Sequence, residues 1–155
     1  RDVAAATLDP QRISVTITPS GEAEITAITN DAGDDPVSLT PVCVPGGIGA
    51  HKWADRRMLV ALEAAFAPHE PLLCDLDGVV LEASRWAVAA ELDGRLVTPP
   101  ADGRILPSLG VAVLHEAIRP EPHTLTLDDL ARASAVYVIN AVRGMVPVAG
   151  IGGVR

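Results

Sequence analysis

The sequence has few aromatic residues, two cysteines and no long apolar run. Only 3% of its 155 residues are aromatic although 48% are hydrophobic, and this aliphatic excess in a small acidic chain predicts apolar surface that a partner covers. No stretch is long and apolar enough to span a bilayer, and no signal-peptide pattern opens the sequence. Cys43 and Cys74 lie outside any motif. We therefore expect reduced, buried thiols in a cytoplasmic protein, without a disulfide.

Basic residues are also scarce. Twelve basic against twenty acidic residues give a net charge of −8, which argues against a nucleic-acid or anionic-membrane partner. The histidines show no metal-ligand spacing, so no zinc site is expected; they are His51, His69, His115 and His123. The length suits one domain, or the larger part of one.

The first third of the chain alternates apolar and polar residues as strands do. Residues 12–18 and 22–28 alternate on either side of Pro19-Ser20-Gly21, which predicts a β-hairpin. Residues 37–44 predict another strand. The glycine-rich stretch 45–49 contains no phosphate-binding pattern, so we interpret it as a linker.

The rest of the chain mixes helical and strand patterns. Apolar residues at helical spacing predict a helix over 55–66, which Pro68 ends and which begins within three residues of Lys52. The dipeptides Asp77-Gly78 and Asp93-Gly94 predict hairpins over 72–81 and 86–98. The remaining expectations are helices over 108–118 and 127–134, capped by Ser108 and Thr126, then strands over 135–139 and 145–148. This pattern indicates an α/β (α+β) domain with a mixed sheet and two or three helices.

Two charged motifs carry the functional signal. Lys52, the only lysine, lies in His51-Lys52-Trp53-Ala54-Asp55-Arg56-Arg57, and thirty residues later comes Glu82-Ala83-Ser84-Arg85. Either residue alone would most often be an ordinary solvated side chain. Further runs follow in order: 96–100 (LVTPP), 102–107 (DGRILP), 126–131 (TLDDLA) and 138–148 (VINAVRGMVPV).

Together these runs resemble the class IV, D-amino-acid-aminotransferase-like pyridoxal phosphate enzymes, and most of all the aminodeoxychorismate lyases. The match is strong from residue 51 onward and weak over residues 11–50. It implies the C-terminal domain of that fold, with a mixed, barrel-like sheet. The expected division is therefore a partial N-terminal region and linker over 1–50, and a cofactor-binding domain over 51–155.

The resemblance also implies roles for individual residues. Lys52 would form the Schiff base with pyridoxal phosphate, and Glu82 would pair with the pyridine nitrogen and keep it protonated. Arg56, one helical turn from Lys52, would lie near the cofactor's phenolic oxygen and lower the lysine pKa. The phosphate would bind to the amides of Leu109 and Gly110 and to the Asn140-Ala141 turn. Arg85 and Arg143 are the candidates for binding substrate carboxylates.

The chain departs from the family pattern around these residues. Gly110 stands where relatives carry a threonine whose hydroxyl would bond phosphate, and Ala141 replaces a serine. Residues 87–89 (AVA) replace the usual Asn-Val-Phe. Each lost hydrogen bond to a charged ligand would cost about 1.5–3 kcal/mol. This pattern fits a weak or specialised enzyme, or one drifting toward inactivity.

Three functions remain open at this point. The first is a lyase that converts 4-amino-4-deoxychorismate to 4-aminobenzoate and pyruvate in folate synthesis. The second is a class IV aminotransferase with the same cofactor and an amino substrate. The third is a truncated, non-catalytic subunit or dimerisation module. For each we expect a homodimer, or association with a chain that carries the missing N-terminal domain.

Overall fold

The computed structural model describes residues 11–29 and 35–152 and divides the chain into two compact units, Arg1–Gly33 and Asp34–Arg155. In the first unit, β1 (Gln11–Ile17) pairs antiparallel with β2 (Ala23–Thr29), and Ile17 lies opposite Ala23. The predicted hairpin is therefore confirmed. Its large apolar side chains are exposed, namely Ile13, Val15, Ile17 and Ile25.

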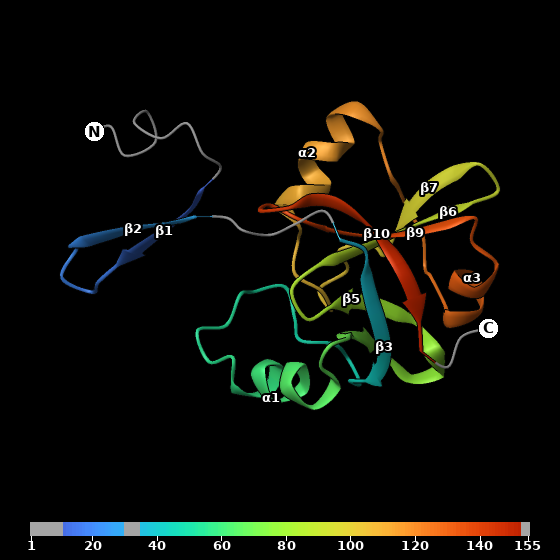
Figure 1. The fold of residues 1–155 in the computed structure, drawn as a ribbon, viewed down its shortest axis with the longest axis horizontal. Helices are drawn as coiled ribbons and strands as arrows, with labels where there is room; N and C mark the ends of the chain where they lie inside the picture. The colour runs from blue at the N-terminus through green and yellow to red at the C-terminus, as the bar shows by residue number, and fades with distance from the viewer. Residues whose placement is uncertain (1–10, 30–34, 153–155) are drawn as a thin grey trace. The chain divides into compact units, whose positions relative to one another are not determined.

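The second unit is built on one curled, eight-stranded mixed sheet (Figure 1). Its strands lie in the order β5-β4-β3-β10-β9-β6-β7-β8. The pairs β10–β3, β3–β4 and β7–β8 are parallel, and the other neighbours are antiparallel. The bounds are β3 (Val37–Cys43), β4 (Glu70–Cys74), β5 (Val80–Ala83), β6 (Ala87–Leu92), β7 (Arg95–Thr98), β8 (Glu121–Pro122), β9 (Ala135–Asn140) and β10 (Gly144–Ile151).

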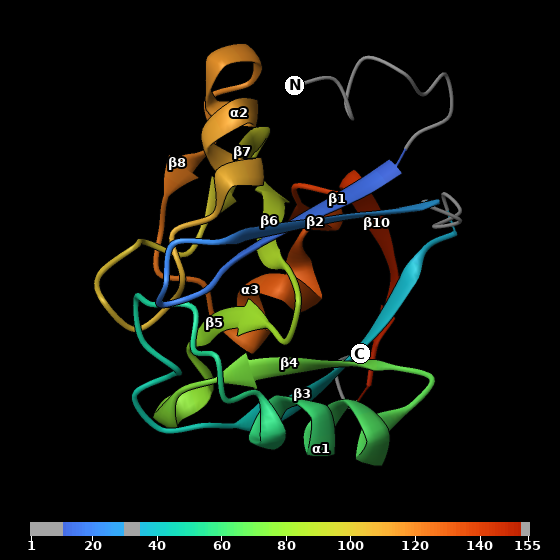
Figure 2. The ribbon, with the colours of Figure 1, turned by 90° about the vertical axis from the view of Figure 1, so that its left-hand side faces the viewer.

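Three α-helices accompany this sheet: α1 (Arg57–Phe66), α2 (Leu109–Ala117) and α3 (Leu127–Arg132). α1 contacts β4 and α2 contacts β9, and the two helices lie at opposite sides of the unit (Figure 2). The side chain of Ser108 accepts a hydrogen bond from the amide of Val111, and Thr126 and Asp129 form a capping box. Both predicted N-caps are thus confirmed, because a side-chain oxygen satisfies a first-turn amide that has no partner within its helix.

The fold class is confirmed, with corrections to single elements. α1 begins at Arg57, not at residue 55, so Lys52 lies in a loop and not at a helix start. The two-residue strand β8 was not predicted. The predicted strand over 37–44 is present as β3, which pairs in the large sheet between β4 and β10.

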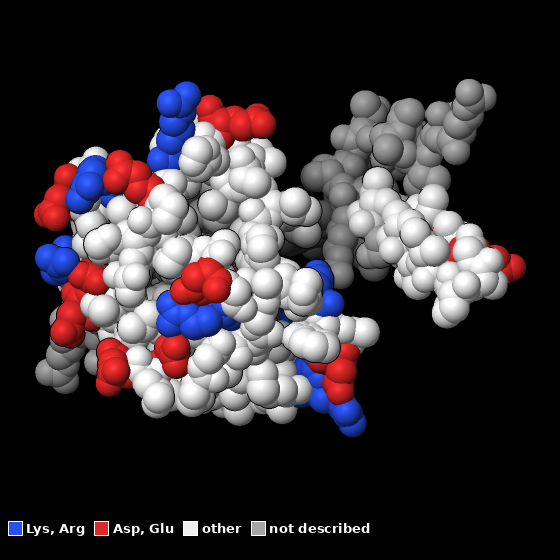
Figure 3. Space-filling view, turned by 180° about the vertical axis from the view of Figure 1, so that it is seen from behind, with Lys and Arg blue, Asp and Glu red and all other residues white. Residues whose placement is uncertain are grey.

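The core of the second unit is aliphatic. Fully buried side chains from five strands meet in it, including Leu39, Leu72, Val80, Val88 and Val138. Within residues 11–29 and 35–152, no helix combines the length and hydrophobicity of a membrane span. On the face seen from behind, basic and acidic side chains lie in small groups with uncharged surface between them (Figure 3).

Candidate active site

One cavity of about 400 Å³ lies between the loop before α1, the β5–β6 connection, the approach to α2 and the end of β9. Eight of the nine predicted site residues line it, although they are spread over ninety residues of sequence. They are Lys52, Arg56, Glu82, Arg85, Leu109, Gly110, Asn140 and Ala141. The fold therefore brings together the residues that the motifs singled out.

Glu82 supplies a buried carboxyl group to this cavity. It lies on the edge strand β5, is 7% exposed, and accepts a hydrogen bond from the amide of Leu106 at 3.3 Å. Burial raises the pKa of Glu82 to about 7, and the bond from Leu106 opposes this rise. A carboxylate in such a place gains most from a cationic partner, since burial disfavours its charge while a neighbouring positive charge favours it.

Lys52 approaches the same cavity from an exposed loop. The loop is held at two points. The indole Nε1 of Trp53 donates to the carbonyl oxygen of Ile48 at 2.9 Å, and the amide of Gly49 donates to the carbonyl oxygen of Arg104 at 3.1 Å. No ion-pair partner of Lys52 is present in the described part of the chain. Its amine is therefore available to a ligand in the cavity.

The N-terminus of α2 forms the wall next to the end of β9. Gly110 is buried, and a Cβ atom there would lie 2.8 Å from Cγ2 of Ile139 and 3.1 Å from the carbonyl carbon of Asn140. A threonine would not fit here without a shift, so glycine at this position allows the close approach of α2 to β9. The amides at this helix start remain suited to an anion.

Asn140 shapes the turn that faces α2. Its Oδ1 accepts hydrogen bonds from the amides of Val142 at 2.9 Å and Arg143 at 2.8 Å. The predicted tight turn is thus present, and it is held by the asparagine side chain. A phosphate accepts hydrogen bonds, so the groups of this turn that could contact one are donors: its backbone amides and Nδ2 of Asn140.

Two arginines of the cavity wall are bound to acidic residues that the sequence analysis did not identify. Arg56 donates to the carbonyl oxygen of Ser84 at 3.4 Å and lies 3.7 Å from Oε1 of Glu63. Arg85 pairs with Glu70 through two nitrogens and lies 3.8 Å from the same Glu63 oxygen. These pairs raise the pKa of Arg85. Its charge is therefore largely compensated before any substrate arrives.

Arg143 is the predicted site residue that the fold does not bring to the cavity wall. Its guanidinium lies over the ring of Trp86, 5.3 Å from the centroid, and Nη2 donates to the carbonyl oxygen of Asp35 at 2.9 Å. Trp86 itself lines the cavity and is almost fully buried. Arg143 thus contacts the cavity only through Trp86, a stacking arrangement that favours a structural contribution.

Some lining residues were missed altogether, notably Trp53, Trp86, Leu106 and Ile139. Trp53 and Trp86 are the only tryptophans of the chain; the first lies within the Lys52 motif and the second directly follows the Glu82 motif. Their rarity was a usable signal. The sequence carries no such signal for Ile139, because a buried strand residue that borders a cavity has the same sequence pattern as one that does not.

Comparison with known proteins agrees with this geometry. The family model for class IV amino-transferases matches residues 50–151. No relative was found among curated proteins. A solved structure from Mesorhizobium loti, assigned as an amino-acid aminotransferase, is 26% identical with a TM-score of 0.78, covering 90% of this chain and 72% of that one.

Two further structures share the fold at lower identity. A hypothetical aminotransferase from Mycobacterium tuberculosis in its pyridoxal-phosphate-bound form is 19% identical, with a TM-score of 0.77 and coverage of 98% and 64%. The 4-amino-4-deoxychorismate lyase from Pseudomonas aeruginosa is 20% identical, with a TM-score of 0.65 and coverage of 87% and 57%. This chain thus spans less than two thirds of either. The match of the family model over most of the chain, together with a shared fold, shows that the chain belongs to the class IV aminotransferase family.

Proposed function

We propose that this chain carries the pyridoxal phosphate site of a lyase that converts 4-amino-4-deoxychorismate to 4-aminobenzoate and pyruvate. The observation that carries the proposal is the meeting of Lys52 and Glu82, an available amine and a buried carboxyl, in one cavity. The shared fold with the lyase from Pseudomonas aeruginosa supports the reaction type.

The residues present suit the cofactor. No cation pairs with Glu82 among residues 11–29 and 35–152, and a protonated ring nitrogen would supply one and favour the ionised carboxylate. The start of α2 beside the Asn140-Ala141 turn offers amides to a phosphate. Leu109 and Gly110 would provide those amides, and Lys52 would hold the cofactor covalently. Arg56 would face the phenolic side of the ring. When bound, pyridoxal phosphate supplies the electron sink for the carbanion at the substrate carbon.

The protein's own part in the reaction is then proton transfer and orientation. Nζ of Lys52 would take the proton from the substrate carbon that bears the amine. It would then give this proton to the enolpyruvate that departs as its bond to the ring breaks, so that pyruvate is released and the ring becomes aromatic. Glu82 would keep the ring nitrogen protonated. No oxidant is needed, because the atoms of the substrate equal those of the two products.

An aminotransferase is the second candidate, and the likeness to the Mesorhizobium loti protein, at 26% identity, favours it. One experiment separates the two. Purified protein with added cofactor receives 4-amino-4-deoxychorismate in one arm, and an amino acid with a keto acid in the other. Fluorescence of 4-aminobenzoate in the first arm supports the lyase, whereas transfer of the amino group in the second arm alone supports the aminotransferase. Turnover in neither arm, with cofactor bound, overturns both enzymes.

Assembly belongs to the same proposal. Large apolar side chains are exposed around the cavity mouth and on α2, including Trp53, Met58, Leu109 and Val113. Apolar surface in water costs about 25 cal/mol per Å², so we propose that the chain self-associates or pairs with a chain that supplies further N-terminal structure. Sedimentation at low micromolar concentration checks this. A clean 16.1 kDa species, with and without pyridoxal phosphate, would contradict the proposed assembly.

A further inference from the structure

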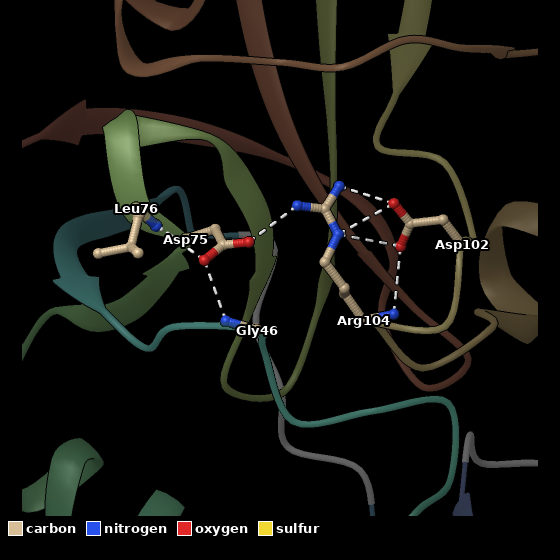
Figure 4. A network of polar contacts seen from close by, with 5 residues as sticks. All are labelled: Gly46, Asp75, Leu76, Asp102 and Arg104. Atoms are coloured by element: carbon tan, nitrogen blue, oxygen red, sulfur yellow. Dashed lines mark hydrogen bonds and ion pairs between the residues drawn. The ribbon is translucent and has the colours of Figure 1, made fainter.

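A polar cluster outside the cavity joins the loop that leads to Lys52, the end of β4 and the segment before α2 (Figure 4). Asp75, at the end of β4, accepts hydrogen bonds through Oδ1 from the amides of Gly46 at 3.0 Å and Leu76 at 2.8 Å. Its Oδ2 accepts a hydrogen bond from Nη1 of Arg104 at 2.9 Å. Arg104 in turn forms a forked pair with Asp102, with Nη2 at 2.6 Å from Oδ2. Neither Asp75 nor Arg104 lines the cavity.

The backbone of Arg104 also touches the loop that leads to Lys52. Its carbonyl oxygen accepts the amide of Gly49 at 3.1 Å. A Cβ atom on Gly47 would lie 2.2 Å from the same oxygen, and Gly47 has a φ of +70°. Only glycine permits this approach, because an L side chain is both strained and blocked there. The loop therefore packs on Arg104 as well as bonding to it.

Each segment in the cluster leads directly to a site residue. Gly49 lies three residues before Lys52. Asp75 ends the strand that pairs with β5, where Glu82 lies opposite Leu73. Arg104 lies two residues before Leu106, whose amide donates to Glu82, and the chain then enters α2. The ion pair between Asp75 and Arg104 thus connects the segments that position Lys52, Glu82 and the start of α2.

We propose that Asp75 and Arg104 are positioning residues that hold the Lys52 loop, Glu82 and the start of α2 at the spacing a cofactor requires. The inference rests on the proposed function of the cavity. Asp75 remains charged for this task, because the amides of Gly46 and Leu76, followed by Arg104, lower its pKa. Asp102, and then Asp75, raise the pKa of Arg104. The pair therefore persists across the neutral range.

The test compares Arg104→Gln and Asp75→Asn with a matched control, Arg95→Gln. Arg95 forms an ion pair with Glu121 at 3.2 Å between β7 and β8, and neither residue lines the cavity. In the first arm, amide hydrogen exchange of a peptide over residues 44–52 is measured without cofactor. We expect about tenfold faster exchange in both cluster variants, since each removes a hydrogen bond to a charged group. The Arg95 variant should exchange like the wild type.

The second arm titrates pyridoxal phosphate and measures how much of the bound cofactor borohydride fixes to Lys52. We expect binding weakened about tenfold or more and a smaller fraction fixed at Lys52, at a melting temperature close to that of Arg95→Gln. Arg104→Lys, which keeps the cation facing Asp75, should restore part of both readouts.

Either arm can overturn the inference. Unchanged exchange in the cluster variants would show that the ion pair does not hold the loop. Faster exchange with unchanged cofactor binding and Lys52 labelling would contradict the positioning role. A wild-type protein that binds no cofactor overturns the proposed function, and the cofactor-free arm still decides whether the cluster holds the Lys52 loop.

Discussion

The two walls of the cavity are built differently. The sheet wall carries Glu82, Trp86 and Ile139, all buried among the strands of the core, whereas the loop wall carries Lys52 and a Trp53 side chain that is 63% exposed. A few hydrogen bonds, from Trp53, Gly49 and Gly46, fix the loop wall, while the pairing of β5 with β4 and of β9 with β6 fixes the sheet wall. The loop wall is therefore the part with the lower local stability.

This difference matches what the proposed function would require of each group. A carboxyl group that keeps one proton on a ring nitrogen needs a single position and little water. An amine that binds the cofactor, releases it and then carries a proton has to move. The fold places the fixed group in the core and the movable group on a loop. The burial of Glu82 is unfavourable to the empty protein, and a cationic ligand would offset it.

Removing the movable group should have the largest effect. Lys52→Ala is expected to abolish covalent cofactor attachment completely, because the chain has no second lysine. The fold should be unaffected, since Lys52 is exposed and lies outside the core. Lys52→Arg, which keeps the charge but cannot form the bond, is the control. Melting curves and mass spectrometry after reduction check both points, and attachment in either variant would place the site elsewhere.

Neutralising Glu82, the fixed group, should have the second largest effect. Glu82→Gln is expected to retain cofactor and to lose most of its turnover, on the order of 100-fold, as when one preorganised electrostatic group is removed. A neutral amide does not hold the proton of the ring nitrogen. Cofactor titration and initial rates measure the two quantities separately. Turnover equal to that of the wild type would mean that Glu82 is not the partner of the ring nitrogen.

The same substitution should change how stability depends on pH without cofactor. Burial raises the pKa of Glu82 from 4.5 to about 7, so its contribution to stability is fully present below pH 4.5 and is lost as pH rises through 7. The difference corresponds to about 3 kcal/mol. Urea unfolding at pH 4.5 and pH 8 should show a steeper loss in the wild type than in Glu82→Gln. Parallel losses in the two proteins would argue against a raised pKa.

A smaller effect is expected where α2 meets the sheet wall. Gly110→Thr restores the family's residue but introduces a Cβ 2.8 Å from Ile139. It should lower the free energy of unfolding by about 1–3 kcal/mol without improving cofactor affinity. Gly150→Thr is the matched control, because a Cβ there meets no atom within 4 Å. Tighter cofactor binding at an unchanged free energy of unfolding would show that the structure around Gly110 accommodates a larger side chain without cost.

The contrast between the walls also explains what the sequence could predict. The hairpins and caps follow from local chemistry, as in Asp93-Gly94 and Ser108, and the structure confirms them. The prediction that Lys52 and Glu82 share one site came from the family resemblance, since no local pattern relates residues thirty positions apart. The helix start was wrong because Asp55 pairs with Arg57 before the helix begins and does not extend it.

Other features depended on tertiary contacts that no spacing encodes. The contact of Gly110 with Ile139 and the ion pair of Asp75 with Arg104 each join residues 29 positions apart. Similarly, Arg143, which the resemblance assigned to the substrate, stacks on Trp86. In each case the contact joins residues from different segments of the chain.

The most direct test of the central claim is borohydride reduction of the wild-type protein at saturating pyridoxal phosphate, followed by mass spectrometry of its peptides. Since Lys52 is the sole lysine, the only competing amine is the N-terminus, and peptide mapping separates the two. The account predicts a pyridoxyl adduct on the peptide that contains Lys52. Saturating cofactor with no adduct on that peptide would contradict it.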